Sequence, residues 1–241
     1  MTGAAQGIGA GIAKMASELG ARLALVDMNA DLLETVRESL PGPCKVFAGS
    51  VSDPDFVEAM VEETAQTFGP IHGLVNNAGI IRPAMIAKMT LQQWRDVIDI
   101  NLTGAFIVLQ AVGRHMLGHV SGETGASIVN ISSDAGRRGT IGQINYAAAK
   151  AGILGVTMSA AREWAADNIR VNTLCFGAVE TPMTEVMRSD RFRDKLLAQI
   201  PMGRVAQTGE AASAACFLLS DAASYITGQH IGVNGGFHIA T

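Results

Sequence analysis

The chain has 241 residues, a formal net charge of −4 and an apolar fraction of 48%. This length and composition suit one α/β domain that buries a large core. Because the charge balance is acidic and no basic stripe is present, we expect no nucleic acid and no anionic membrane surface among its partners.

Apolar runs typical of buried strands alternate with helical patterns along the whole chain. The predicted strands are 22–27, 44–51, 71–76, 126–132, 169–175 and 230–233. The predicted helices are 10–19, 31–40, 54–68, 91–117 (broken near Asn101) and 145–166. Such alternation predicts a doubly wound parallel sheet of the Rossmann type, covered by helices on both faces, in a single domain over residues 1–241.

The first strand of that sheet is missing from the sequence. Thr2–Gly9 has the glycine pattern of the turn that follows a first strand, yet only Met1 and Thr2 precede the first glycine. In a doubly wound sheet this strand is central, so its loss leaves backbone N–H and C=O groups of the two neighbouring strands without hydrogen-bond partners. We hypothesise that the natural chain starts upstream of Met1.

Three glycines, Gly3, Gly7 and Gly9, precede the first predicted helix. Glycines allow a sharp turn and a close approach to a pyrophosphate, and the helix N-terminus offers free N–H groups and a positive dipole. Asp27 follows eighteen residues after Gly9, at the end of a predicted strand. A carboxylate at that place binds both ribose hydroxyls of NAD and repels the extra phosphate of NADP. The alternative is that Asp27 caps the next helix.

Tyr146 and Lys150 are four residues apart in a helical pattern, so they share one helix face. A nearby ammonium and a cationic nicotinamide ring both favour tyrosinate, which lowers the tyrosine pKa from its usual ~10. Ser133 lies just past a strand end, where open α/β sheets bind ligands. Taken together with the glycine turn and Asp27, these residues indicate proton transfer beside a bound dinucleotide.

Several spaced motifs, in this order, resemble the classical short-chain dehydrogenase/reductase family over nearly the whole chain. They are T-G-x-x-x-G-x-G (Thr2–Gly9), N-N-A-G (Asn76–Gly79), N-L-T-G (Asn101–Gly104), S-x12-Y-x3-K (Ser133, Tyr146, Lys150), E-T-P-M (Glu180–Met183) and I-T-G-Q…V-N-G-G (Ile226–Gly236).

The resemblance implies a role for each of these positions. It makes Tyr146 the acid/base, Lys150 the ribose ligand that lowers the tyrosine pKa, Ser133 the substrate anchor, and Asn101 the holder of a water in the proton relay. The implied cofactor-binding residues are Gly3, Gly7, Ile8, Gly9, Asp27, Ser50, Val51, Asn77, Ala78, Gly79, Tyr146, Lys150, Val179 and Thr181. The implied substrate-binding residues are Ser133, Gln143 and Gly177.

The motifs are closest to those of 3-oxoacyl-(acyl carrier protein) reductases, but two departures matter. Those enzymes prefer NADPH and dock the carrier protein with two basic residues, whereas Thr124 and Asp167 align at those places here. Ser50 stands before the adenine-contacting Val51, where many relatives have Asp.

The expected function is therefore NAD-dependent interconversion of a secondary alcohol and a ketone, on a small alcohol or hydroxyacyl substrate. A 3-oxoacyl-(acyl carrier protein) reductase is the first alternative. A non-catalytic NAD-sensing protein and a lyase or epimerase with bound NAD are the others. Asp134, Ala135 and the segment Met183–Phe192 are expected near the substrate, with Met183–Phe192 either an adaptable lid or a packed surface helix.

The remaining features concern assembly, location and metals. The family resemblance implies a homotetramer. No apolar run reaches the ~18 residues that span a bilayer, and the first ten residues lack the basic and apolar regions of a secretory signal, so we expect a cytoplasmic protein. Cys44, Cys175 and Cys216 are expected to be free thiols. His115 and His119 are a helix turn apart without a third ligand, so no metal is expected.

Overall fold

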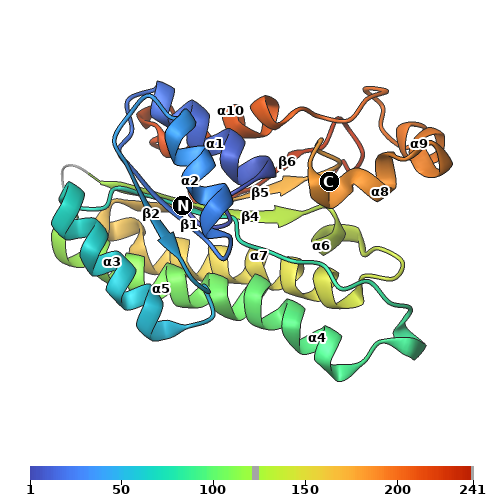
Figure 1. Cartoon of the computed structure of the whole chain (residues 1–241), viewed down its shortest axis with the longest axis horizontal. Helices are drawn as coiled ribbons and strands as arrows, with labels where there is room; N and C mark the ends of the chain where they lie inside the picture. Colours follow the sequence, from blue (N-terminus) through green and yellow to red (C-terminus); the bar gives the residue numbers. More distant parts are fainter. Residues whose placement is uncertain (121–124, 240–241) are drawn as a thin grey trace.

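The computed structural model describes residues 1–120 and 125–239. A layer of parallel strands is covered by α1, α2 and α10 on one face and by α3, α4, α5 and α7 on the other (Figure 1). The strands are β1 (Leu23–Asp27), β2 (Cys44–Ala48), β3 (Gly73–Asn76), β4 (Ala126–Ser133), β5 (Ile169–Phe176) and β6 (His230–Val233). The helices are α1 (Gly7–Glu18), α2 (Ala30–Ser39), α3 (Pro54–Phe68), α4 (Leu91–Ile98), α5 (Ala105–His119), α6 (Ala135–Arg138), α7 (Ile144–Trp164), α8 (Glu185–Arg188), α9 (Asp190–Leu197) and α10 (Thr208–Leu219).

All pairings between these strands are parallel, in the orders β1-β2 and β3-β4-β5-β6. This confirms the predicted α/β fold class, in which each crossover helix returns the chain to the same end of the sheet. The carboxyl ends of β1, β4 and β5 therefore lie along one edge, and the site is built there.

Met1 and Thr2 lie between β1 and β3 and bridge the two strands. The Val26 amide donates to the Met1 carbonyl at 2.9 Å, and the Thr2 amide donates to the Val75 carbonyl at 3.0 Å. Thr2 forms an isolated parallel bridge with Val26. Below this bridge a cavity of about 440 Å³ opens between the edges of β1 and β3. The expected gap in the sheet is thus present and is spanned at one end.

Local sequence explains where several helices begin. The Asp53 carboxylate accepts hydrogen bonds from the Asp55 and Phe56 amides, and Pro54 occupies the first turn of α3. Thr90 and Gln93 form a reciprocal capping box at the start of α4. Caps of this kind satisfy amides that have no partner inside the helix.

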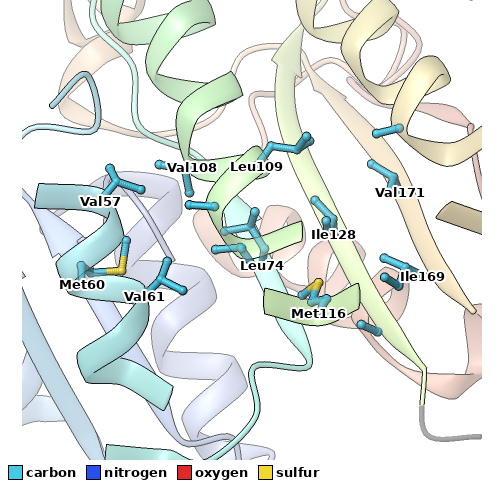
Figure 2. Close-up of a cluster of buried hydrophobic side chains, with 14 of the residues drawn as sticks. Val57, Met60, Val61, Leu74, Val108, Leu109, Met116, Ile128, Ile169 and Val171 are labelled. Carbon is cyan, nitrogen blue, oxygen red and sulfur yellow. The ribbon is translucent and has the colours of Figure 1, made fainter. Parts of the chain in front are cut away.

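The largest buried cluster lies between the sheet and the helices α3 and α5 (Figure 2). It brings together Val57, Met60 and Val61 of α3, Val108, Leu109 and Met116 of α5, and Leu74, Ile128, Ile169 and Val171 of the strands. Burial of aliphatic side chains of this size stabilises the fold by roughly 1.5–3 kcal/mol each. The cluster fixes α3 and α5 under the strands that end at the site.

Three expectations about the elements need correction. The strand predicted over 44–51 ends at Ala48, because Gly49 and the following residues turn toward the cleft. The break near Asn101 is a π-helical turn, Asp99–Gly104, rather than an interruption of the helix. Helix α10 was not predicted at all; its small residues pack against α1, β4 and β5.

The continuous helical stretch Leu91–His119 is long and apolar enough, by length and composition, to cross a membrane. Half of its most apolar window is buried inside the fold. Its α5 portion packs on β3, β4 and α3, so the requirements of a core helix account for its apolar character.

Candidate active site

A cleft of about 410 Å³ runs along the carboxyl ends of the strands, from the glycine turn and Asp27 to Tyr146 and Lys150. Open α/β sheets bind their ligands at this edge. Every residue predicted to bind cofactor or substrate lines the cleft, apart from Gly9. Of the predicted catalytic residues, Ser133, Tyr146 and Lys150 line it, whereas Asn101 lies behind its wall.

The glycine turn has the backbone shape that its sequence predicts. Gly3 and Gly7 have positive φ angles of 62° and 58°. A Cβ on Gly9 would lie 2.0 Å from the Gly3 carbonyl oxygen, so a side chain there cannot be accommodated without moving α1. Gln6, which precedes α1, makes no side-chain capping bond in the described chain. The first amides of α1 are therefore available to an anion.

Two side chains connect this turn to β3. The Asn77 side-chain amide donates to the Gly3 carbonyl at 2.8 Å and to the Thr2 carbonyl at 3.1 Å. The Thr2 hydroxyl accepts from the Asn77 and Ala78 amides, each at 3.0 Å. Asn77 thus braces the glycine turn against the end of β3, and Thr2 is a second brace that sequence reasoning did not single out.

Asp27 is held at the end of β1 beside the glycine turn. One carboxylate oxygen accepts from the Ala5 amide and the other from the Asn29 amide, both at 3.2 Å. The cap of α2 is Asn29, whose side chain accepts from the Leu32 amide at 3.0 Å. The alternative role of Asp27 as the helix cap is therefore wrong, and its carboxylate lines the cleft.

Tyr146 is fixed by the residue before it. The Asn145 side chain accepts from the Tyr146 amide at 2.8 Å and donates to the carbonyls of Gln93 at 2.9 Å and Arg82 at 3.1 Å. Asn145 is completely buried, so the first turn of α7 is tied to α4 and the loop before it. Sequence reasoning missed this role of Asn145. Its position at the start of a helix, next to the tyrosine, was the feature that could have indicated it.

Lys150 lies beneath the tyrosine ring. Its Nζ is 5.7 Å from the centroid of the Tyr146 ring and donates to the Ile131 carbonyl at 2.8 Å. Lys150 is 4% exposed, and this burial lowers its pKa to about 8. The amine is therefore still mostly protonated at neutral pH. The expected proximity of Lys150 and Tyr146 is present in the cleft.

The expected lowering of the tyrosine pKa is not what these protein groups produce by themselves. Burial raises the pKa of Tyr146 above its ordinary value, and the hydrogen bond with Ser133 opposes this only in part. Removing a phenol from water disfavours its charged form. A base at this position needs additional positive charge near the phenol, beyond Lys150.

Asn101 is completely buried in the π-helical turn. Its side chain accepts from the Ile80 amide at 2.8 Å and donates to the Ile80 carbonyl at 3.0 Å. These two bonds hold the strand-to-loop segment after β3 against the helix. The helix is thus irregular at Asn101 but not interrupted, and the role of Asn101 in a proton relay stays a prediction.

Comparisons with known proteins agree with this geometry. A family model described as "Enoyl-(Acyl carrier protein) reductase" matches residues 3–238. The chain is 43% identical to a 3-oxoacyl-[acyl-carrier-protein] reductase FabG of Thermotoga maritima, over 99% of this chain and 96% of the relative. The corresponding protein of Vibrio cholerae is 39% identical over the same shares of the two chains. A crystal structure described as a putative short-chain alcohol dehydrogenase from Sinorhizobium meliloti superimposes with a TM-score of 0.91 at 34% identity, covering 98% of this chain and 94% of that one.

The chain belongs to the short-chain dehydrogenase/reductase family. It is an oxidoreductase acting on CH–OH groups and using a nicotinamide cofactor.

The residues present fit a dinucleotide in this short-chain dehydrogenase/reductase. A Cβ on Gly7 would lie 3.3 Å from the Thr181 side chain, so the segment after β5 closes over the glycine turn. Val179 and Thr181 are buried at 2% and 8% exposure along this segment. Ser50 and Val51 line the opposite end of the cleft next to Asp27. The cleft thus contains the free backbone amides of the glycine turn, the Asp27 carboxylate and the buried Lys150 amine.

The residues predicted to bind substrate, Ser133, Gln143 and Gly177, line the cleft together with Met183 and Met187. The segment predicted over Met183–Phe192 folds as a short 3-10 turn, α8 and the beginning of α9. Its two methionines line the cleft, and each keeps more than two fifths of its surface exposed. This placement is compatible with either a lid or a surface helix.

Other expectations concern the periphery of the molecule. His115 and His119 stack with ring centroids 4.4 Å apart, and His115 accepts from the Ile71 amide. No group of three or more metal-ligating side chains occurs in the described part of the chain. The three cysteines are free thiols. Thr124, one of the two positions aligned with carrier-protein docking, lies outside the described residues.

Proposed function

We propose that this short-chain dehydrogenase/reductase uses NAD to interconvert a secondary alcohol and a ketone on a small, freely diffusing substrate. The observation that carries the proposal is the Asp27 carboxylate, held by two amides at one end of the cleft that contains Tyr146 at the other. A carboxylate there accepts bonds from ribose hydroxyls and repels a 2′-phosphate. Neither Gln6 nor Met28, which also line this end, supplies a positive charge for that phosphate.

The chain's own residues supply proton transfer and orientation. Ser133 and Tyr146 hold the substrate oxygen between their hydroxyl groups, and the Tyr146 hydroxyl gives or takes its proton. Lys150 keeps a cationic amine beneath the phenol and favours its ionised form. When bound, the nicotinamide ring supplies or accepts the hydride. The segment with Val179 and Thr181 packs against the glycine turn at Gly7.

A second candidate, reduction of 3-oxoacyl groups on an acyl carrier protein, is favoured by the names of the relatives. Against it stand Thr124 and Asp167, which occupy the two positions where that subfamily has basic docking residues. A partner that docks on basic residues is disfavoured by an aspartate at the same place. We therefore place the carrier-protein reaction second.

The test is a turnover assay with NAD and NADP side by side. Oxidation of secondary alcohols is measured with NAD and with NADP. Reduction of the matching ketones and of a 3-oxoacyl thioester is measured with NADH and with NADPH. The absorbance of the reduced cofactor reports turnover in both directions. The proposal expects turnover of alcohols and ketones with a clear preference for NAD. A preference for NADPH combined with activity confined to the thioester would favour the carrier-protein reaction. No turnover of any substrate would favour an NAD-sensing protein, and cofactor retained through purification would favour a lyase or epimerase.

We further propose that the protein is a cytoplasmic homotetramer. Large apolar side chains are exposed on helices away from the cleft, among them Leu91, Phe106, Met158 and Phe217. Exposed apolar groups of this size are typical of surfaces that pair with another copy. Light scattering coupled to size-exclusion chromatography tests this assembly, and a monomer at micromolar concentration would contradict it.

A further inference from the structure

Asp134 is a buried acid in the cleft wall with one oxygen that lacks a partner. The residue is 2% exposed and lines the cleft. Its Oδ1 accepts from the Asn234 side-chain amide at 3.1 Å. Its Oδ2 is buried and has no hydrogen-bond partner among the described residues. Buried polar atoms are nearly always hydrogen-bonded, because an unpaired one loses its water without compensation.

The position of Asp134 is set by the same turn that presents Ser133. Ser133 is the last residue of β4, and at Asp134 the backbone becomes helical, with φ −57° and ψ −24°, to begin α6. The Asp134 amide donates to the Phe176 carbonyl at 3.0 Å, and the Ala135 amide donates to the Ser133 hydroxyl at 3.2 Å. Consecutive Cα atoms are about 3.8 Å apart. The unpaired acid therefore stands next to the residue that holds the reacting oxygen.

We propose that Asp134 binds a second hydroxyl of the substrate, on the carbon next to the reacting carbinol, and so selects vicinal diols and hydroxyketones. This inference rests on the proposed function and names its substrate class. A hydroxyl suits the unpaired Oδ2 because it donates a hydrogen bond to a carboxylate oxygen, a bond that an amide nitrogen in the same place does not accept.

The surroundings of Asp134 favour a neutral hydroxyl over a charged ligand. Burial raises its pKa, while Asn234, His238, Arg137 and Arg138 oppose that rise. These basic neighbours disfavour a substrate ammonium at this place. The rest of the wall carries Met183, Met187 and Phe237, which suits a short aliphatic skeleton around the two oxygens.

The experiment compares butane-2,3-diol with butan-2-ol, and 3-hydroxybutan-2-one with butan-2-one, by kcat/KM in wild type and Asp134→Asn. The asparagine keeps an oxygen for Asn234 and places an amide where Oδ2 stands. We expect the wild type to prefer the diol at least tenfold, and the variant to lose at least tenfold of that preference. An equal fall for both members of a pair would overturn the proposal and assign Asp134 a structural role.

Asn234→Ala is the matched control. The substitution removes the amide that donates to Oδ1 of Asp134 and, at 2.9 Å, to the His238 carbonyl. It leaves Oδ2 of Asp134 in place. If Asp134 only anchored this C-terminal turn, both variants would change diol and mono-alcohol turnover in parallel. If Asp134→Asn fails to fold, the wild-type enzyme alone still tests the proposal. Equal wild-type kcat/KM for the diol and the mono-alcohol, or for the hydroxyketone and the ketone, overturns it. Wild-type turnover of ketones without that preference refutes the diol inference alone, whereas absence of any turnover refutes the proposed function with it.

Discussion

At the scale of single residues, Tyr146 is predicted to carry the proton transfer. Tyr146→Phe keeps the ring above Lys150 and removes only the hydroxyl, so turnover should fall by about 100- to 10,000-fold. NAD affinity, measured by fluorescence titration, should change little. The chain's other tyrosine offers a matched control, because Tyr225 is fully exposed and Tyr225→Phe should retain activity. Substantial turnover by Tyr146→Phe would refute the assignment.

Asp27 is predicted to set the cofactor preference. Asp27→Asn weakens hydrogen bonds to ribose hydroxyls and removes the charge that repels a 2′-phosphate. We expect NAD to bind about 10- to 100-fold more weakly, and we expect the difference in affinity between NAD and NADP to become smaller. Asp31→Asn, an exposed acid in the first turn of α2, is the control. Unchanged Michaelis constants for both cofactors would contradict the prediction.

The sequence was most informative where a residue's chemistry and spacing act together, as for Tyr146 and Lys150. It was least informative where a role depends on tertiary contacts. Asn145 reaches the Gln93 carbonyl, 52 residues away in sequence, and Asp134 is paired with Asn234, 100 residues away. The raised pKa of Tyr146 likewise depends on burial that no local pattern reveals.

At the scale of elements, α1 and α10 offer a matched pair of glycines in their first turns. A Cβ on Gly9 would overlap the Gly3 carbonyl, whereas no atom of the described residues lies within 4 Å of a Cβ on Gly209. Gly9→Ala should abolish NAD binding and destabilise the fold by about 1–3 kcal/mol. Gly209→Ala should stabilise it by about 0.5–1 kcal/mol. Urea unfolding and a cofactor titration measure both, and equal effects of the two substitutions would show that the predicted overlap is relieved.

Glu210 is predicted to make the start of α10 sensitive to acid. It accepts two bonds from Arg204, at 2.7 and 2.8 Å, and one from the Gln207 amide, which lower its pKa from 4.5 to about 2. Because the folded state lowers this pKa, its contribution to stability is present above pH 4.5 and is lost as the pH falls toward 2. Glu210→Gln should therefore lower the urea midpoint at pH 7, by an amount that shrinks below pH 4.5.

The Arg204→Gln variant serves as the partner in a double-mutant cycle. If the ion pair is responsible, the double variant should be little less stable than either single variant. Additive losses that stay constant with pH would refute the interpretation.

Element boundaries were predictable where polar caps or long apolar runs mark them, as for α3, which begins at Pro54 and ends at Phe68 as expected. Helix α10 was overlooked because its apolar residues do not gather on one face of the helix. It is instead buried through small residues, Ala211, Ala212 and Ala215, against α1 and the sheet. The π-helical turn at Asn101 requires the backbone of Ile80 as partner, and that partner is 21 residues distant.

At the scale of the whole molecule, cofactor binding should stabilise the fold, because the cleft joins elements from β1 to the segment after β5. NAD at 100 times its dissociation constant adds about 2.7 kcal/mol, which corresponds to a rise in Tm of about 5–10 °C for a chain of this size. Thermal unfolding followed by circular dichroism tests this, with NADP at equal concentration expected to give the smaller shift. Identical shifts for the two cofactors would count against discrimination by Asp27.

Strand β4 and the neighbouring helix α7 hold the reactive groups through hydrogen bonds that run in both directions between the two elements. The Lys150 amine donates to the Ile131 carbonyl at 2.8 Å, and the Ser132 hydroxyl donates to the Lys150 carbonyl at 2.7 Å. Ser133, Tyr146 and Lys150 therefore form one stiff unit, whereas Met183 and Met187 belong to separate short helices. Evolution can reshape the mouth of the cleft without disturbing proton transfer. Substitutions in the short helices should alter which molecules enter more than how fast an entered molecule reacts.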